Sequence, residues 1–383
     1  MIEKITIKNY KSIRELTDFE LKPINILIGA NNSGKSNFLD VFAFLKDTLL
    51  DGGNSIDGKS NNSGWQVALE KRGGGESVCY NSQQQFQIFC LGHPFQYSLE
   101  FESSGQFWRI RDEQFINVLN GSHLLFEPEF KKILTPEEKK EVYGSNWPSG
   151  DTALNKFLKR KDGDQETLKF VQRLSEIKIY DRIHTEMWSP IRIPKVSTGE
   201  TVLDEDGGNL VGVLHQLSQI QPGFLSELNS SLKALFPDFA RVSFPNNARG
   251  ETVIRWEDEN GRIAGAAQLS DGTLKFLCLI SILENPNPPA LIGIDEIDAN
   301  LHPKMQVILA DMLAEASQRT QIIATTHNPD FVSMFTPDEI VILQQYKGET
   351  EMRRFSTKGA LELWLKHFTT RKLWLMGELE SRW

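Results

Sequence analysis

One segment restricts the possible folds of this chain more than any other: an apolar, strand-like run followed at once by a glycine-bearing loop and an amphipathic helix. Residues 24–28 read INILI, residues 29–36 read GANNSGKS, and apolar residues recur at helical spacing after them. The loop matches the pattern GxxxxGK followed by Ser or Thr, in the strand–loop–helix context that the pattern requires. Because the N-terminus of a helix attracts anions, the segment predicts a phosphate-binding site at the end of a buried strand.

The residue types in this loop suit the triphosphate of ATP. Gly29 and Gly34 let the backbone curl so that successive N–H groups face an anion. The Lys35 ammonium supplies a positive charge to the β- and γ-phosphates, and the Ser36 hydroxyl is a ligand for Mg²⁺. A chance match in a Gly/Asn/Ser turn is the alternative, and the flanking strand and helix argue against it. The residues expected to contact the nucleotide here are Gly29, Asn32, Ser33, Gly34, Lys35, Ser36 and Asn37.

A second apolar run ends in two adjacent acids, which suits a magnesium site beside the loop. Residues 291–296 read LIGIDE. Mg²⁺ takes oxygen ligands and keeps several waters, so one hydroxyl and one carboxylate suffice on the protein side. We expect Asp295 to hold the metal together with Ser36, directly or through water. Glu296 is the candidate base that orients and deprotonates the attacking water. Taken alone, an acid pair after an apolar run is common and would also serve as a helix cap.

Two further segments gain meaning from their order along the chain. Residues 269–273, LSDGT, stand directly before an apolar helix, where Ser270 would ordinarily be a helix cap. Residues 322–327, IIATTH, form an apolar strand that ends in His327, and a lone histidine in that place is more often structural than catalytic. The succession of phosphate loop, LSDGT, acid pair and histidine favours a functional role for both.

With these motifs the chain resembles the ABC-type ATPase superfamily and, within it, the RecF/SMC-like branch of soluble AAA-family ATP-binding proteins, an overcoming-lysogenization-like head without a Toprim domain. The resemblance is carried by INILIGANNSGKSN, by LSDGT in place of the LSGGQ signature, by LIGIDEIDANLHP as Walker B with the D-loop, by IIATTHNP as the switch-histidine loop, and by the opening IKNYKSI. Asp271 stands where the family commonly has glycine. The resemblance implies an α/β fold: a P-loop ATPase head with a mixed sheet, flanking helices, an antiparallel β subdomain and a helical insertion.

The resemblance also implies that the protein works as a homodimer, or a higher oligomer, held together by ATP. Each copy would bind ATP on the Lys35 loop, and Ser270 and Gly272 of the other copy would close over the γ-phosphate. Asp298, in the D-loop, would lie across the interface. His327 would hydrogen-bond the γ-phosphate or the attacking water.

The patterns along the chain predict three regions. Residues 1–120 form an N-terminal ATPase lobe with the phosphate loop and, over 85–116, antiparallel strands. Residues 121–205 form a helical insertion, because their composition is charged and helix-favouring. Residues 206–383 form a C-terminal ATPase lobe with the signature, Walker B, D-loop, switch histidine and a tail. The glutamine of the family's Q-loop stays unassigned, since residues 83–114 offer several candidates.

Three smaller segments carry their own expectations. The glycine- and serine-rich residues 51–64 predict a surface loop. Lysine clusters within residues 131–161, interleaved with phenylalanines, would suit DNA or RNA, but nearby glutamates fit a solvated helix face equally. The tail, residues 361–383, contains three tryptophans and either seals the core or docks a partner.

Composition narrows the class of protein. The net charge is −9 and the pI is near 5.4, which excludes a generally basic nucleic-acid coat but not a local basic groove. Three cysteines without a CxxC pair favour a reducing compartment. The longest apolar run, residues 274–283, is about half a membrane span, and the first residues lack the apolar core of a signal peptide. We therefore expect a cytoplasmic protein that does not contact the membrane.

Two functions remain open at this point. In the first, ATP binding and hydrolysis drive a nucleic-acid-linked motor or switch in DNA repair or anti-phage defence, acting with a separate effector protein, a nuclease or toxin. In the second, bound nucleotide holds together a scaffold that restrains such a partner with little turnover. A transporter is disfavoured because Lys35 and Ser270 are too far apart for a plain transporter nucleotide domain. A fused Toprim nuclease is disfavoured because too few residues follow His327.

Overall fold

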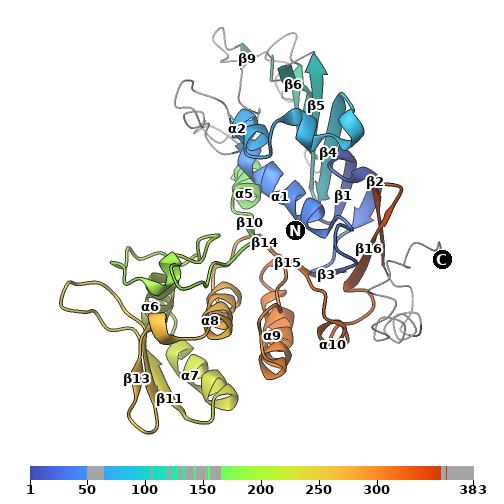
Figure 1. The fold of residues 1–383 in the computed structure, drawn as a ribbon. Helices are drawn as coiled ribbons and strands as arrows, with labels where there is room; N and C mark the ends of the chain where they lie inside the picture. The colour runs from blue at the N-terminus through green and yellow to red at the C-terminus, as the bar shows by residue number, and fades with distance from the viewer. Residues whose placement is uncertain are drawn as a thin grey trace.

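The computed structural model describes residues 1–49, 64–104, 107–118 and 165–354, with short pieces between 122 and 155 and residue 359. Its centre is a six-stranded sheet (Figure 1). In spatial order the strands are β10 (Lys178–Tyr180), β14 (Leu291–Ile294), β15 (Gln321–Thr325), β3 (Ile24–Ile28), β16 (Ile340–Tyr346) and β17 (Glu349–Arg354). Neighbouring strands run parallel except β16 and β17, which form an antiparallel pair.

The central strands are covered on both faces, as parallel strands between two layers must be. Every residue of β3, β14 and β15 is buried, which confirms the apolar strands expected before the phosphate loop, the acid pair and His327. Side chains alternate between the two faces of the sheet. Ile24, Ile26 and Ile28 therefore belong to one apolar cluster and Leu27 to the other.

An eight-stranded antiparallel sheet lies on one side of the core sheet, with α1 (Lys35–Leu49) packed in the same apolar cluster (Figure 1). Its strands, in spatial order, are β2 (Ile13–Glu20), β1 (Lys4–Tyr10), β4 (Gln85–Gly92), β5 (Phe95–Ser104), β6 (Phe107–Asn117), β7 (Ser122–Glu127), β8 (Lys132–Ile133) and β9 (Val142–Tyr143). Burial alternates along β4, so the antiparallel strands predicted for residues 85–116 are confirmed. Between α1 and β4 lie α2 (Gly64–Glu70), α3 (Gly75–Val78) and η1 (Tyr80–Ser82).

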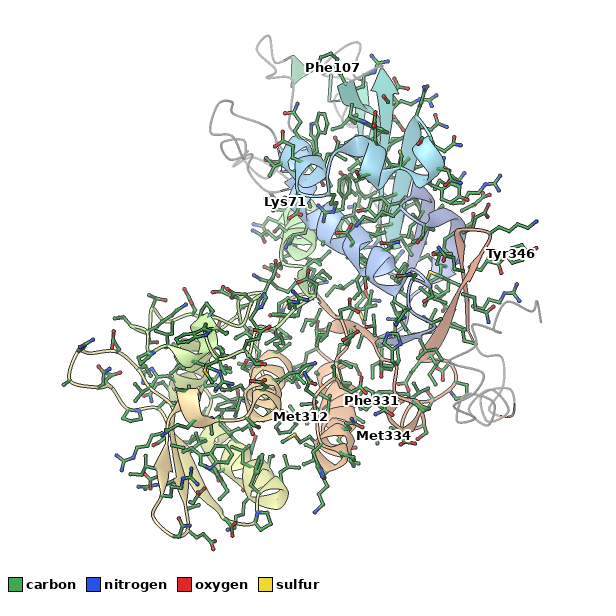
Figure 2. The ribbon with its side chains drawn as sticks, in the orientation of Figure 1. Lys71, Phe107, Met312, Phe331, Met334 and Tyr346 are labelled. Atoms are coloured by element: carbon green, nitrogen blue, oxygen red, sulfur yellow. The ribbon has the colours of Figure 1, made fainter. Side chains whose placement is uncertain are left out.

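Helices α8 (Asp271–Leu283), α9 (Pro303–Ala316) and α10 (Pro329–Val332) belong to the apolar cluster on the opposite side of the core sheet. Helix α6 (Leu210–Ile220) packs against α8 and α7 (Phe224–Leu235) packs against α6, and the 3-10 turns are η2 (Pro190–Arg192) and η3 (Ala266–Gln268). A small antiparallel sheet packs beside α7 and consists of β11 (Phe239–Ser243), β12 (Arg255–Asp258) and β13 (Ile263–Ala264). Met312 on α9 and Phe331 on α10 both belong to the apolar cluster beneath the sheet (Figure 2).

The region expected as a helical insertion, residues 121–205, is only partly helical in its described residues. One helix, α5 (Gln165–Ser175), packs against α1, but β7, β8 and β9 extend the antiparallel sheet and β10 joins the core sheet. The physical reason is the edge of β6, whose backbone groups must pair, and β7 supplies their partners from Glu113 to Asn117. Charged composition alone did not reveal this pairing.

Several expectations lie outside the described residues or concern membranes. The basic clusters within residues 131–161, most of the loop at 51–64 and the tail 361–383 fall in stretches whose side chains the structure does not describe. Within the described ranges, none of the helices is both long enough and apolar enough to cross a lipid bilayer.

Candidate nucleotide-binding site

The phosphate loop lies between the carboxyl end of β3 and the start of α1, as its sequence context predicts. The Lys35 ammonium points back into the loop and donates to the carbonyl oxygens of Gly29 and Ala30, both at 2.9 Å. Lys35 is only 6% exposed. Burial lowers the pKa of Lys35 to about 8, although the negative charges of Asp295 and Glu296 act in the opposite direction. Among the described residues no carboxylate forms an ion pair with this buried cation, so a bound phosphate would supply the missing negative charge.

Two glycines are required by the close packing of this loop. A Cβ at Gly29 would lie 2.2 Å from the carbonyl oxygen of Leu343 on β16. Gly34 has φ +98°, and a Cβ there would lie 2.2 Å from the Thr350 hydroxyl. The loop keeps its shape because β16 and β17 press directly against its backbone.

A polar clasp fastens the loop to the strands around it. The Thr350 hydroxyl lies 2.7 Å from Ser12 Oγ and 3.0 Å from the carbonyl oxygen of Ser33. The Ser12 oxygen also accepts a hydrogen bond of 2.7 Å from the Asn37 side chain. Thr350 lies on β17 and Ser12 lies between β1 and β2, so both sheets hold the loop. Sequence reasoning did not find the clasp, because no local pattern marks either residue.

The two predicted metal ligands lie side by side. The Ser36 hydroxyl donates to Asp295 Oδ2 at 2.7 Å. The fully buried Thr325 hydroxyl contacts the other carboxylate oxygen of Asp295 and accepts a hydrogen bond of 2.7 Å from the backbone N–H of Glu296. Thr325, which the sequence did not single out, therefore holds the Asp295 carboxylate and the backbone of Glu296. A hydroxyl and a carboxylate beside a phosphate loop are the oxygen ligands that Mg²⁺ prefers, so these residues fit that ion.

Glu296 follows the strand on a sharp turn. Its φ is +47°, a conformation that non-glycine residues seldom adopt, and its side chain is exposed. The Lys275 ammonium on α8 holds the turn by donating to the carbonyl oxygens of Glu296 at 2.7 Å and Ala299 at 3.0 Å. Burial lowers the pKa of Lys275, whereas the charge of nearby Asp298 raises it. Lys275 is a second residue that the sequence patterns missed, and Asp298 itself is largely buried in its own chain.

His327 follows β15 and faces the same group of charges. The ring is half-buried, and burial lowers its pKa, as does the positive charge of Lys35 to a smaller extent. Three acids oppose this shift: Glu296, Asp295 and Asp298. The histidine is therefore neutral near pH 7 and lies within electrostatic reach of the phosphate loop and the acid pair.

The LSDGT turn lies apart from the phosphate loop. Ser270 caps α8, because its hydroxyl accepts a hydrogen bond of 3.1 Å from the backbone N–H of Thr273. A Cβ at Gly272 would lie 2.5 Å from the carbonyl oxygen of Asn300 in the D-loop. Both Ser270 and Gly272 line a cavity of about 670 Å³ together with residues at the start of α9, including Lys304, and no residue of the phosphate loop lines it.

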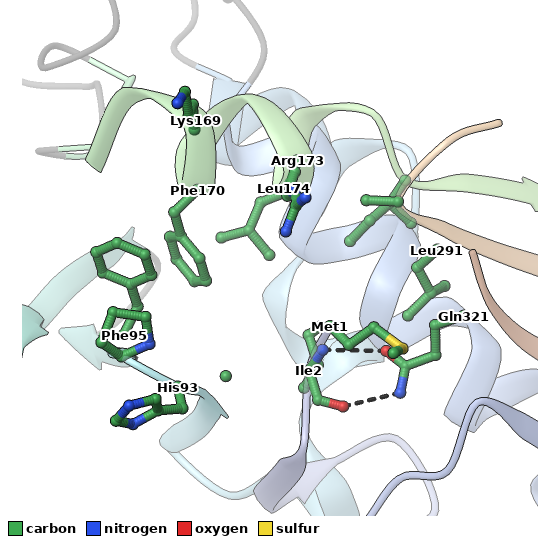
Figure 3. Close-up of a pocket in the computed structure, with 14 residues that line it drawn as sticks. Met1, Ile2, His93, Phe95, Lys169, Phe170, Arg173, Leu174, Leu291 and Gln321 are labelled. Carbon is green, nitrogen blue, oxygen red and sulfur yellow. Dashed lines mark hydrogen bonds between the residues drawn. The ribbon is translucent and has the colours of Figure 1, made fainter. Parts of the chain in front are cut away.

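A smaller cavity of about 220 Å³ lies at the opposite edge of the core sheet (Figure 3). Its wall includes Leu291 and Gln321, the first residues of β14 and β15, and Phe170 of α5. The Gln321 side chain anchors the backbone of Ile2 there through bonds of 3.1 and 2.8 Å. Since the phosphate loop follows the carboxyl end of β3, which is parallel to β15, this cavity is separate from the nucleotide site.

Strand β10, which pairs with β14, is relevant to the Q-loop glutamine that the sequence left unassigned. The Asp295 N–H donates to the carbonyl oxygen of Tyr180 at 2.9 Å, so the segment that enters the site beside the acid pair begins with Asp181. The glutamine candidates of residues 83–114 lie in and next to β4, β5 and β6 of the eight-stranded sheet.

Among the described residues, no group of three or more His, Cys, Asp and Glu side chains gathers into a metal site.

The fold is that of an SMC head, with a P-loop at the carboxyl end of β3. The structure superimposes on the SMC head in the crystal structure "SmcHead bound to the C-winged helix domain of ScpA" with a TM-score of 0.55 and 14% identity, covering 94% of this chain and 99% of that one. The chain belongs to the family described as "AAA domain, putative AbiEii toxin, Type IV TA system", whose model matches residues 24–77 and 95–333. The resemblance to RecF/SMC-like ATPases is thereby confirmed.

Two curated relatives share parts of the sequence. The Septu protein PtuA of Bacillus mycoides (strain KBAB4) is 32% identical over 362 residues, which cover 89% of this chain and 40% of that protein. The Retron Vc95 probable ATPase of Vibrio cholerae serotype O1 biovar El Tor is 29% identical over 131 residues, or 31% of this chain and 25% of that protein. The chain thus spans less than half the length of either relative.

Proposed function

We propose that the protein is an ATP-binding and ATP-hydrolysing head that dimerises around ATP. One observation carries this proposal: the buried Lys35 ammonium, the Ser36–Asp295 pair, Glu296 and His327 lie together at the carboxyl ends of the parallel strands β3, β14 and β15. A cation on the phosphates, two oxygen ligands for Mg²⁺ and a carboxylate that can accept a proton from water are groups that phosphoryl transfer to water uses.

The chain's own residues account for the proposed reaction. Lys35 and the loop N–H groups bind the phosphates, and Ser36 with Asp295 would hold Mg²⁺, which neutralises charge on the phosphate oxygens when bound. The Glu296 carboxylate accepts a proton from water while the water oxygen forms a bond to the γ-phosphorus and the bond to the ADP oxygen breaks. His327, half-buried beside the acid pair, orients that water or the γ-phosphate.

The two proposed half-sites, the phosphate loop and the cavity beside the LSDGT turn, lie apart, and this separation supports the proposed dimer. The cavity beside Ser270 and Gly272 contains two helix N-termini, those of α8 and α9, and no phosphate loop of its own. A triphosphate carried by a second copy would complete it, because helix N-termini attract anions. In that arrangement Asp298 and the D-loop lie at the interface between the copies.

We propose further that this head serves anti-phage defence with a separate effector protein, a nuclease or toxin, and that DNA or RNA is its candidate trigger. The family description names a toxin and a toxin–antitoxin system, and the relatives are a Septu protein and a retron ATPase. A DNA repair role uses the same site and differs only in the partner and the trigger.

ATP turnover and particle mass measured on the same preparation test the proposal. We expect the wild-type protein to release phosphate, Lys35→Ala to bind ATP weakly, and Glu296→Gln to accumulate as an ATP-bound dimer. Wild-type turnover by Glu296→Gln would refute the assignment of the base. Tight ATP retention with negligible wild-type turnover, together with a copurifying partner, would favour the nucleotide-held scaffold instead.

A further inference from the structure

A buried arginine is hydrogen-bonded to the backbone at the start of the LSDGT turn and just before it. Arg192, at the end of η2, has a side chain that is only 8% exposed. Its Nη1 donates to the carbonyl oxygens of Ala266 at 3.0 Å and Leu269 at 2.8 Å, and its Nε donates to Thr185 O at 2.8 Å. Such a set of bonds uses the whole planar fork of the guanidinium, which lysine does not possess.

The same guanidinium is paired with the acid that replaces the family's glycine. Arg192 Nη2 donates to Asp271 Oδ1 at 2.6 Å. Asp271 is the first residue of α8, lies between Ser270 and Gly272, and is about half exposed on the wall of the 670 Å³ cavity. An unpaired carboxylate in that position would repel an incoming phosphate, because like charges brought together at an interface are strongly unfavourable.

We propose that Arg192 is a positioning residue for nucleotide capture: by pairing with Asp271 it neutralises that carboxylate, so that Ser270 and Gly272 can receive the γ-phosphate of ATP bound to a second copy. This inference rests on the proposed ATP-held dimer. It explains how a chain with an acid in this turn can use it to bind an anion. The glycine of the common signature needs no such partner, whereas Asp271 does.

A purely architectural role for Arg192 makes a different prediction. If the arginine only held the backbone of residues 266–269, its loss would harm the turn whatever residue stood at position 271. If it neutralises a charge, removing that charge by Asp271→Asn restores what the loss of the arginine removed. The double variant therefore separates the two roles.

The test measures ATP-dependent dimerisation by sedimentation in the Glu296→Gln background, where hydrolysis does not dissolve the dimer. We expect Arg192→Ala to weaken dimerisation by about tenfold or more, and Arg192→Ala with Asp271→Asn to recover to within about threefold of the parent. Asp271→Asn alone should also stay within about threefold of the parent. Arg241→Ala, which removes an exposed arginine from its ion pair with Glu257 on the small sheet, is the matched control and should have no effect.

Each outcome bears on the inference. Dimerisation by Arg192→Ala equal to the parent, or failure of Asp271→Asn to rescue it, overturns the inference. Absence of any ATP-dependent dimer in the parent itself refutes the proposed function instead. Should Arg192→Ala unfold in a thermal scan, Arg192→Gln replaces it, since the amide still donates to carbonyl oxygens but carries no charge. The same loss and the same rescue are then expected.

Discussion

Burial of the Lys35 ammonium makes nucleotide binding sensitive to pH. Its pKa of about 8 in the ligand-free protein means that the side chain loses its proton above that value, whereas a bound triphosphate raises the pKa and restores the proton. Binding therefore takes up a proton above pH 8, and affinity falls as the pH rises. We expect ATP affinity to be flat from pH 7 to 8 and then to fall by up to about tenfold per pH unit.

Calorimetric titration of the Glu296→Gln variant with ATP across this range measures the effect. Lys35→Arg is the control, because arginine keeps its charge throughout, and its affinity should change little with pH however weak it is. Parallel pH profiles for the lysine and arginine proteins would contradict the role given to the Lys35 proton.

A single methyl group added at Gly272 should reduce ATP turnover, which needs the second copy, more than it reduces folding stability. The added Cβ would lie 2.5 Å from the carbonyl oxygen of Asn300, so the signature turn or the D-loop must move. We expect Gly272→Ala to lower the free energy of unfolding by about 1–3 kcal/mol and to reduce ATP turnover much more severely than that loss explains. Denaturant unfolding and phosphate release measure the two quantities.

Gly265→Ala is the matched control, since its Cβ would lie 3.7 Å from the nearest atom, an ordinary contact. It precedes the same turn and should leave turnover near the wild-type value. Equal losses of turnover in both variants would show that the contact with Asn300 is not what matters.

Among the secondary-structure elements, β17 supports the phosphate loop through Thr350, which contacts the loop backbone. Replacing the Thr350 hydroxyl by a methyl group in Thr350→Val keeps the shape but removes the clasp to Ser12 and Ser33. We expect ATP affinity to fall by about three- to tenfold, the equivalent of one lost hydrogen bond. Backbone amides of residues 29–36 should exchange faster with deuterium in the same variant, because the loop is less firmly held.

Thr350→Ser keeps the hydroxyl and should restore both the affinity and the slow exchange. If the valine protein binds ATP as tightly as wild type, the clasp has no part in shaping the loop.

Local patterns predicted the elements that build the site, and they did so because each pattern is complete within one stretch of chain. The apolar run of β3, the glycine loop and the periodic face of α1 are contiguous, and so are β14 with its acids. Thr350, Lys275 and Arg192 escaped prediction for the opposite reason. Their partners lie in other segments of the chain, at separations that range from 7 residues for Arg192 and Thr185 to 338 for Thr350 and Ser12. A lone threonine, lysine or arginine carries no mark of such a bond.

The partly helical insertion illustrates the same limit at the level of pairing. Residues 122–127 form a strand because β6 offers an open edge, a fact about the neighbour rather than about the segment. At Ser270 the two interpretations of the sequence do not exclude each other. The residue caps α8, as an ordinary helix cap would, and it also lines the cavity where nucleotide is predicted to bind.

For the whole molecule, the separation of the two half-sites predicts complementation between inactive variants. Lys35→Ala lacks a working phosphate loop, and Ser270→Arg blocks the cavity that receives the partner's triphosphate. A mixed dimer regains one complete site, built from the intact half of each copy. Mixing equal amounts should therefore restore about a quarter of the wild-type turnover, since about half of the dimers are mixed and each has one working site of two.

Phosphate release from the mixture, compared with each variant alone, measures this. Lys35→Ala mixed with Glu296→Gln is the control, because both changes fall in the same half-site and, across the mixed dimer, neither site is whole. Restoration in the control mixture, or none in the test mixture, would contradict a site shared between copies.

The clasp on the phosphate loop also has a consequence for biosynthesis. Thr350 and the Ser33 carbonyl that it contacts are 317 positions apart, and β3 lies between two strands, β15 and β16, that follow it by about as much. At a translation rate of about 5–20 residues per second, the ribosome synthesises the phosphate loop tens of seconds before it synthesises β16 and β17, which pack against the loop. A nascent or prematurely terminated chain therefore carries the GKS motif without the shape to use it, and nucleotide capture is deferred until translation of the ATPase core is nearly complete.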